Sequence, residues 1–414
     1  MRFLPISLVR ERRDFRLLLL ATLGSSLGTW LAFVALVVDV YDRTESATWV
    51  GGLLLAEFVP IVLLGIFAGP FVDRLPRRTI LIASDLARAA VFLVLPFAGS
   101  ASQIVFLALL AGVATSFFRP AAYAGLPNLV TEADLPRANG LIQSAENLTI
   151  ALGPLSGGIL VAVGGSDPAY FVNAVSFIFS GLLILRIRGT LETEREPSKG
   201  HWRELREGLS LVRRSKALLA VLIVWSGIAT AANAGVNVAE VVLAKKVFDS
   251  GDFGFGLLAA SAGLGLVIGS LASGQVIECV GIRRPYQASL LLMALGIGAA
   301  ALAPGVWVAA VFVTFSGVGN GLAVVCNATL VQNGAPDRLR GRAFMLMMSC
   351  GAAVFGLAMF LSGFATDLWG ARVTWGIAAG LYLCAALASV VLLRGVAEPA
   401  REGATVGVQP TDVL

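Results

Sequence analysis

Long apolar runs, separated by short polar breaks, follow one another along almost the whole chain of 414 residues. A helix of about 20 predominantly apolar residues is long enough to cross the hydrocarbon core of a bilayer. Backbone groups in that core have no water to bond, so only helices and closed β-barrels cross it. The runs are too long and too continuously apolar for barrel strands, in which apolar and polar residues alternate. The pattern therefore predicts an all-α integral membrane protein.

The apolar runs divide into twelve predicted spans, and the longest polar stretch, 188–216, separates the first six from the last six. The spans are 16–40, 49–72, 79–98, 102–126, 139–164, 169–187, 217–244, 254–278, 286–303, 305–333, 343–367 and 371–394. We expect four regions, which are an N-terminal half (1–187), a linker (188–216), a C-terminal half (217–395) and a polar tail (396–414).

Composition supports a membrane protein and argues against several other classes. Hydrophobic residues make up 57% of the chain and charged residues 14%, against about 25% charged in soluble domains. The chain has no Gly-rich phosphate loop ending in Lys-Ser/Thr, which argues against an ATP-driven pump. The single histidine, His201, lies in a predicted loop, and the four cysteines lack metal-ligand spacing. The sequence predicts no enzyme, no metal and no cofactor.

The basic residues are distributed very unevenly between the two sides of the predicted membrane protein. Of 31 Lys and Arg residues, 25 lie on the side that holds both termini and the linker, and four lie on the other. Arg88 and Arg119 fall inside spans. Because basic loops stay in the cytoplasm, we expect both termini and the linker to be cytoplasmic. This pattern explains the net charge of +5 without a nucleic-acid partner.

The linker contains apolar residues at helical spacing, Trp202, Leu205, Leu209 and Val212, with Arg and Glu between them. This spacing predicts a short amphipathic helix on the inner membrane surface. Such a helix is either a tether between the two halves or a regulatory element.

An internal repeat links the two halves. An offset of 205 residues places Gly274 on Gly69, Glu278 on Asp73 and Arg342-Ala343 on Arg137-Ala138. Duplicated six-helix halves joined by a basic loop are typical of secondary transporters.

With this repeat, the chain resembles the major facilitator superfamily. The stretch from Gly69 to Arg78 is similar to the signature of its loop between helices 2 and 3, with Pro76 where the usual glycine stands. The resemblance implies a conformational gate, in which charge-assisted bonds hold the two halves together in one access state. Its residues are Gly69, Asp73, Arg74, Arg77, Arg78, Gly274, Glu278, Arg283 and Arg284. The alternative is a basic flank that only sets membrane orientation.

A second signature lies on the fifth span. Gly140, Gly153, Pro154, Gly157 and Gly158 resemble the motif of drug–proton antiporters, although Thr149 replaces one expected glycine. Glycines allow close approach of helices, so we expect the fifth and eighth spans to pack tightly across the two halves. On the eighth span, Gly265 and Gly269 are the expected partners. The alternative is ordinary glycine-rich packing.

Further stretches resemble the bacterial group that holds enterobactin and macrolide exporters. They are Phe117–Ala121, Asp134–Asn139, Ser84–Arg88 and Pro336–Arg342. The resemblance implies a monomeric multi-pass protein of the bacterial inner membrane that exports a small molecule in exchange for protons. The fourth span departs from the pattern of this group at a position that bears on proton coupling. Many such exporters carry an arginine four residues before a glycine, whereas in this chain Ala108 stands four residues before Gly112.

Ionisable residues inside spans are costly and mark candidate functional sites. Burial favours the protonated form of a carboxyl group, so Glu57 is the first candidate proton carrier and Glu146 the second. The alternative role for Glu57 is to bond a polar group on a neighbouring helix. Asp85, Arg88 and Arg119 are further coupling candidates, and Asp85 and Arg88, three residues apart, are also expected to form an ion pair. Asp39 and Glu240, near outer span ends, are expected to be solvated rim carboxylates.

Aromatic and amide side chains inside spans are the candidate substrate contacts. They are Trp30, Phe33, Trp225, Asn233, Asn237, Asn320 and Asn327. The leading functional hypothesis is proton-driven export of amphipathic drugs, antibiotics or siderophores by alternating access. Nutrient uptake by symport and lysolipid flipping on the same fold remain alternatives.

Overall fold

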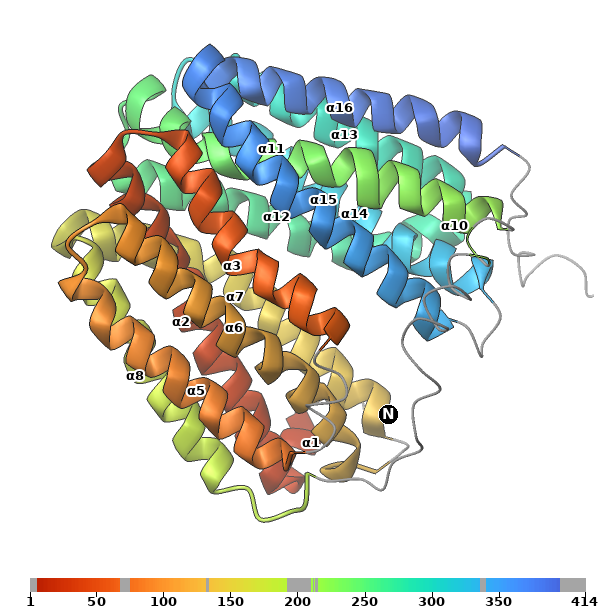
Figure 1. Cartoon of the computed structure of the whole chain (residues 1–414). Helices are drawn as coiled ribbons and strands as arrows, with labels where there is room; N and C mark the ends of the chain where they lie inside the picture. Colours follow the sequence, from red (N-terminus) through yellow and green to blue (C-terminus); the bar gives the residue numbers. More distant parts are fainter. Residues whose placement is uncertain are drawn as a thin grey trace, which may run out of the picture.

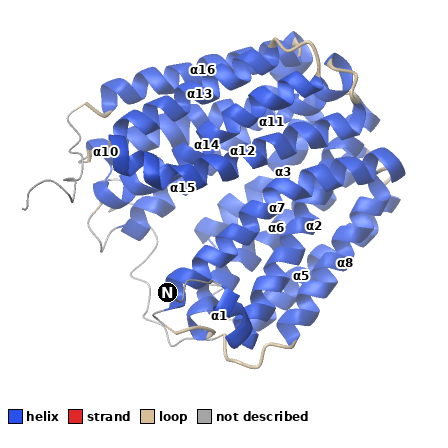
Figure 2. Ribbon diagram, turned by 180° about the vertical axis from the view of Figure 1, so that it is seen from behind, coloured by secondary structure: helices blue, strands red, loops and turns tan. Residues whose placement is uncertain are grey.

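The computed structural model of the chain is shown in Figure 1. It describes residues 6–67, 75–131, 134–191, 210, 212, 215–335 and 340–394. In this part of the chain all regular secondary structure is helical, as Figure 2 shows. The predicted all-α class is confirmed.

The helices are long and follow one another through short turns. In chain order they are α1 (Ile6–Glu11), α2 (Arg13–Thr44), α3 (Ala47–Phe67), α5 (Arg77–Val94), η1 (Leu95–Phe97), α6 (Ala101–Gly125), η2 (Leu126–Asn128), α7 (Leu135–Gly164), α8 (Ser166–Leu185), α10 (Lys216–Ala220), η4 (Val221–Ala229), α11 (Thr230–Val242), η5 (Leu243–Val247), α12 (Gly251–Val280), α13 (Arg283–Ala301), α14 (Val306–Gly334), α15 (Arg340–Trp369) and α16 (Ala371–Leu392).

Within the described residues, each of the twelve predicted spans overlaps a helix or a continuous helical run, and the last five residues of the second span, 68–72, lie outside them. The seventh is the run from α10 to η5, in which the η4 and η5 segments are π-helical. Ten of the helices in the described ranges are long and apolar enough to cross a bilayer. The two other predicted spans correspond to α13 and to α3, whose apolar part is Ala47–Pro60.

The helices form two groups, the N-terminal bundle (α2 to α8) and the C-terminal bundle (α10 to α16). Within the first, α2 packs on α7 and α8, and α5 on α6 and α8; within the second, α14 packs on α12 and α13. We call the end that carries α1 and α10 the base, and the opposite end, with the turns at Glu45, Gly165 and Gly370, the apex. The two bundles meet near the apex and diverge toward the base like a V (Figures 1 and 2).

At the apex, charged residues join the two bundles. Asp367, near the end of α15, accepts hydrogen bonds from the Ala47 amide (2.7 Å), the Thr48 amide (2.9 Å) and the Ser46 hydroxyl (2.6 Å). The carboxylate thereby caps the N-terminus of α3, where the orphan amides and the helix dipole favour negative charge.

Two lysines at the end of η5 complete this set of contacts, which we call the apical clasp. Lys245 pairs with Asp42 of α2 and also with Asp252 of its own bundle, while Lys246 lies 3.2 Å from Glu45. The clasp therefore holds the apex shut in this conformation.

Below the apex, α7 and α12 come into backbone contact across the bundles. A Cβ atom on Gly158 would stand 2.8 Å from the Gly256 Cα, and one on Gly263 would stand 2.7 Å from the Ala151 Cα. The predicted tight packing of the fifth and eighth spans is confirmed. Its predicted partners were wrong, because Gly265 and Gly269 face Thr314 and Val318 of α14. Successive residues on a helix turn by about 100°, so Gly265 lies on another face than Gly263.

The antiporter-like motif on α7 packs against two neighbouring helices, α2 and α12. Gly153 and Gly157 lie against the backbone of α2 at Trp30 and Leu31. Pro154 and Gly158 lie on the other side, where the Pro154 carbonyl and the Gly158 backbone approach Gly256. Gly140, in contrast, has open space around the position of a Cβ atom.

At the base, the structure describes part of the gate motif. Arg77 is buried, and its Nη1 donates to the carbonyl oxygens of Ala124 (2.8 Å) and Leu191 (2.9 Å), both in the first half of the chain. Arg78 follows it as the second residue of α5, Gly274 and Glu278 lie near the base end of α12, and Arg283 and Arg284 begin α13. Gly69, Asp73 and Arg74 lie outside the described residues, as does most of the predicted linker helix.

Candidate functional site

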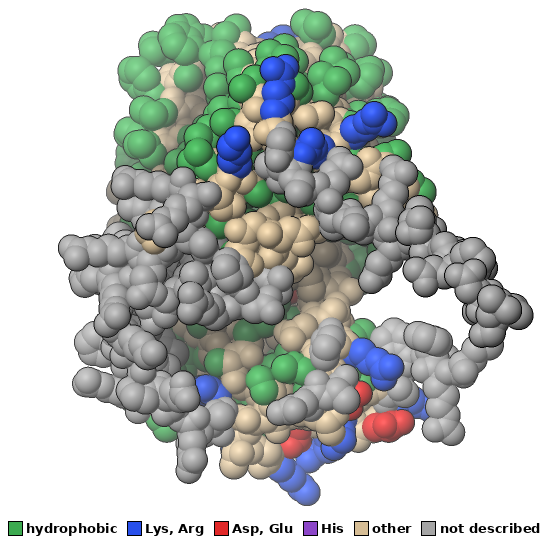
Figure 3. Space-filling model, turned by 90° about the vertical axis from the view of Figure 1, so that its right-hand side faces the viewer, with side chains coloured by type: hydrophobic (Ala, Val, Ile, Leu, Met, Phe, Trp, Pro, Cys, Tyr) green, Lys and Arg blue, Asp and Glu red, His purple; other side chains and the backbone are tan. Residues whose placement is uncertain are grey.

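A polar cavity of about 220 Å³ opens in the wall of the N-terminal bundle. It is lined from four helices by Thr22, Ser25, Ser26, Thr29, Trp30, Arg88, Thr115, Phe118, Arg119, Ala122, Tyr123, Ile142, Gln143, Glu146 and Ile150. Seen from the base, the surface of the molecule is hollowed between the two bundles (Figure 3). A cavity with mixed apolar and polar walls suits an amphipathic small molecule.

One wall of the cavity is a row of hydroxyl groups on α2. Thr22, Ser25 and Thr29 follow one another at intervals of three and four residues, which places them on one helix face. Ser26, next to this row, bonds Thr149 of α7 (2.9 Å). These hydroxyls were not among the predicted substrate contacts, although their spacing along one helix face is visible in the sequence.

The opposite side of the cavity carries an ion pair between two helices. Arg119 of α6 donates to Glu146 of α7 (2.8 Å), and the Tyr123 hydroxyl bonds the same carboxylate oxygen (3.3 Å). The Arg119 side chain is 59% exposed and Glu146 is 14% exposed. The structure thus brings together two of the predicted coupling residues, 27 positions apart in sequence.

Behind the cavity lies the predicted pair of Asp85 and Arg88, which is confirmed. Arg88 Nη2 donates to Asp85 Oδ1 (2.5 Å), and both side chains are buried. The guanidinium group lies between the rings of Phe118 and Phe177, 4.5 and 4.2 Å from their centroids. This cation–π sandwich holds the charge of Arg88 at the cavity wall.

Glu57 lies apart from this cavity, on α3, which packs between α6 and α15. Its backbone is pressed against Gly112 of α6, and its side chain is half-buried. None of the hydrogen bonds among the described residues involves its carboxyl group. This placement fits the prediction of a solitary carboxyl group within a span.

The predicted substrate contacts do not form one site. Of the seven, Trp30 lines the cavity. Phe33 packs edge-on against Trp30, with the two ring centroids 5.6 Å apart. Asn233 and Asn237 lie half-buried on α11, where the Asn237 amide bonds the Asn233 carbonyl. Trp225 is half-buried in η4; Asn320 is half-buried in α14, and Asn327 is buried there.

The prediction that Asp39 and Glu240 are solvated rim carboxylates was wrong. Asp39 accepts bonds from Arg43 (2.6 Å) and from the Tyr170 hydroxyl (2.9 Å) and is 11% exposed. Glu240 is only 6% exposed. Asp39 lies five residues before the end of α2, and Glu240 lies in a helical run that continues to Val247, so neither residue stands at a helix end.

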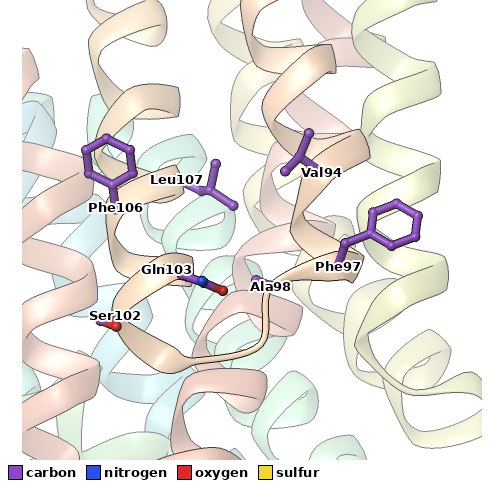
Figure 4. Close-up of a pocket in the computed structure, with 7 residues that line it drawn as sticks. All are labelled: Val94, Phe97, Ala98, Ser102, Gln103, Phe106 and Leu107. Atoms are coloured by element: carbon purple, nitrogen blue, oxygen red, sulfur yellow. The ribbon is translucent and has the colours of Figure 1, made fainter.

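A larger groove lies at the apex, at the turn between α5 and α6 (Figure 4). Its lining includes Val94, Phe97, Phe106 and Leu107 and no charged residue, and Phe97 is 79% exposed. Exposed rings at the end of membrane-crossing helices suit contact with lipid. The groove offers only Ser102 and Gln103 as polar side chains, whereas the cavity beside Arg119 and Glu146 combines charged groups with a row of hydroxyls, so that cavity is the better candidate site.

Comparison with known proteins gives one family and a consistent set of relatives. The model of the transmembrane secretion effector family of the major facilitator superfamily matches residues 7–405. The chain is 28% identical to the multidrug efflux pump Tap of Mycobacterium tuberculosis over 398 residues, covering 91% of this chain and 92% of the relative. It is 27% identical to the putative bacilysin exporter BacE of Bacillus subtilis, covering 81% and 84%.

Among solved structures, the fold is similar to that of a mutant of the nucleoside transporter NupG. The TM-score is 0.76 at 13% identity, with 92% of this chain and 99% of the other covered. The resemblance to the major facilitator fold is confirmed.

Proposed function

The chain belongs to the transmembrane secretion effector family, a family of membrane transporters, and on that basis we propose that it is a secondary active exporter of amphipathic drugs or antibiotics. Relatives named as a multidrug efflux pump and as a putative antibiotic exporter support this substrate class. We further propose that protons drive export by alternating access.

The observation that carries the proposal is the contrast between the two ends of the molecule. The apical clasp joins the bundles at one end, while the surface is hollowed at the other, where the polar cavity lies. A transporter that offers its site to one side while the other is closed has this arrangement. The two bundles are then the units that rock against each other.

The distribution of basic residues supports an orientation. The sequence assigns 25 of its 31 Lys and Arg residues to one side, and the described ones at helix starts, Arg77 of α5 and Arg283 and Arg284 of α13, lie at the base. We therefore place the base and both termini in the cytoplasm of a bacterial cell. The structure then represents the inward-facing state, and the protein acts as a monomer in the inner membrane.

Two carboxylates support different roles in coupling. Glu57 has no described bonding partner and stands within a span, as a proton carrier does. Glu146 is paired with Arg119, and its charge is already balanced. We therefore assign proton transfer to Glu57, and assign to Glu146, Arg119 and Tyr123 the contact with polar groups of the substrate.

Inverted membrane vesicles acidified inside by respiration test this assignment. Adding a substrate from a panel of toxic amphipathic compounds is expected to release protons from vesicles with the wild-type protein, and Glu57→Gln is expected to abolish that release. Asp167→Asn, which makes the same chemical change at an exposed apical residue, is the matched control and should behave as wild type.

Other outcomes distinguish the alternatives. Proton release unchanged by Glu57→Gln removes Glu57 as the carrier but leaves export intact. Substrate accumulation in energised whole cells contradicts export and supports uptake. Movement of labelled lysolipid without a proton gradient supports lipid flipping.

A further inference from the structure

Glu240 lies at the apical end of a polar stripe on α11. The stripe comprises Thr230, Asn233, Asn237 and Glu240, spaced three, four and three residues apart, which places them on one face of the helix. The first three are half-buried, whereas Glu240 is buried at 6% exposure. The stripe therefore becomes more enclosed as it approaches the apex.

The stripe points away from α15 and α16, the two helices of its own bundle that pack most closely on α11. Gly235 faces that side, because a Cβ atom on it would lie 3.4 Å from Ser362 of α15 and 3.8 Å from Thr374 of α16. At about 100° per residue, Glu240 lies about 140° around the helix from Gly235. Its side chain is thus turned away from α15 and α16, on the side of α11 where the other contacting helices are α2, α3 and α12.

Glu240 also lies just below the apical clasp. Five residues separate it from Lys245, which pairs with Asp42 of the opposite bundle. At about 1.5 Å per residue this is about 8 Å along the helix axis. Separation of the bundles at the apex would therefore open the space around Glu240 to water.

No described cation balances the carboxyl group of Glu240. The elements packed against α11 are α2, α3, α12, α15, α16, η4 and η5. Their charged and titratable groups at this end are Asp39, Tyr41, Asp42, Arg43, Glu45 (which caps α2), Lys245, Lys246, Asp252, Asp367 and Arg372, with Glu57 farther along α3.

The cations in that set are engaged elsewhere. Arg43 pairs with Asp39, and Arg372 donates to the carbonyl oxygens of Ala301 and Ala303. Lys245 and Lys246 belong to the clasp. Glu240 Oε1 is buried and has no hydrogen-bond partner among the described residues.

A negative charge without a partner is expensive at such a site. Burying an isolated carboxylate costs many kcal/mol, and the group becomes neutral instead. The closed apex therefore accommodates Glu240 as the neutral acid, whereas an open, hydrated apex accommodates the ionised form.

Building on the alternating access described under the proposed function, we propose that Glu240 takes up a proton from the apical side and that this protonation is required for the apex to close. The closed state binds the proton and the open state releases it, so acid conditions favour the closed apex and alkaline conditions the open apex. In an exporter, this step would reset the empty transporter after the substrate has left.

Distance measurements between the apical ends of the bundles test the inference without any substrate. Spin labels are placed at Ser102→Cys of α6 and Leu302→Cys beyond α13, both exposed, in a protein whose four natural cysteines have been replaced. The protein is reconstituted in lipid nanodiscs, and the distance distribution is recorded between about pH 5 and about pH 8, the range in which buried carboxyl groups can titrate.

With Glu240 present, the long-distance population is expected to grow as the pH rises. Glu240→Gln, which is neutral at every pH and of the same shape, should keep the short distance throughout. Glu240→Asp keeps a titratable group and should keep a pH response, and Asp167→Asn should match wild type.

A pH response that persists in Glu240→Gln overturns the inference, as does a wild-type protein that shows none. Glu240→Met, a second neutral variant, gives the same decision if the Gln variant folds poorly. Because the distance measurement needs no substrate, it can fail while proton release from vesicles succeeds, or the reverse, so the inference and the proposed function are tested separately.

Discussion

The two bundles manage charge inside the membrane in different ways. In the N-terminal bundle, Asp85 pairs with Arg88 and Arg119 pairs with Glu146, and of its candidate coupling carboxylates only Glu57 has no described partner. In the C-terminal bundle, Glu240 stands on α11 with its Oε1 unbonded by any described residue. A paired charge remains balanced whatever state the transporter adopts. A lone carboxyl group becomes neutral whenever it is buried, which makes it sensitive to the conformational cycle.

Breaking the buried pair in the N-terminal bundle is expected to have the largest effect on stability. Arg88→Met leaves Asp85 buried without its cation and should lower the free energy of unfolding by about 3–5 kcal/mol. Unfolding of the purified protein in detergent, followed by intrinsic fluorescence, measures the loss. The double variant Asp85→Leu with Arg88→Met removes both charges and should recover most of it. A single variant as stable as wild type contradicts a structural role for the pair.

Adding a methyl group at the contact between α7 and α12 is expected to have the next largest effect on stability. Gly158→Ala places a methyl group 2.8 Å from the Gly256 Cα, and such overpacking costs about 1–3 kcal/mol. The same denaturation assay should detect it. Gly140→Ala is the matched control, because it lies on the same helix with no heavy atom within 4 Å of the added group. Equal effects of the two variants would show that close approach of α7 and α12 does not matter.

Weakening the apical clasp tests whether it holds the two bundles together at the apex. Asp367→Asn removes the charge that caps α3, and loss of a helix cap costs about 1 kcal/mol, which corresponds to a roughly fivefold larger population of the open apex. The distance between spin labels at Ser102→Cys and Leu302→Cys, recorded at acid pH where Glu240 is neutral, measures this population directly. Glu240→Gln should shift the population in the opposite direction at alkaline pH, where the wild-type carboxyl group is ionised. An unchanged distance distribution in Asp367→Asn rules the cap out as part of the clasp.

The exposed pair in the cavity is expected to have the smallest effect on stability. Arg119→Gln should change the free energy of unfolding by less than about 1 kcal/mol, because partly solvated ion pairs contribute little. Substrate-dependent proton release should nevertheless fall, since Arg119 and Glu146 line the cavity. Arg137→Gln, which breaks the solvent-exposed contact with Asp134 at 3.8 Å, is the control and should leave transport unchanged. A stable variant with full transport would remove the pair from the substrate site.

The sequence by itself determined the features that depend on neighbours along the chain. Apolar runs predicted the twelve helical segments, because length and hydrophobicity alone decide whether a segment can cross a bilayer. The pairing of Asp85 with Arg88 followed from their spacing of three residues on one helix.

Contacts between helices were decided by the tertiary structure alone. The sequence did not indicate that Asp367 caps a helix 320 residues away or that Arg119 pairs with Glu146. It placed Gly265 and Gly269 at the wrong interface, and it left Glu240 at a solvated rim. Such features depend on how each helix is rotated about its axis and how far its neighbours extend, and a single run of residues carries neither quantity.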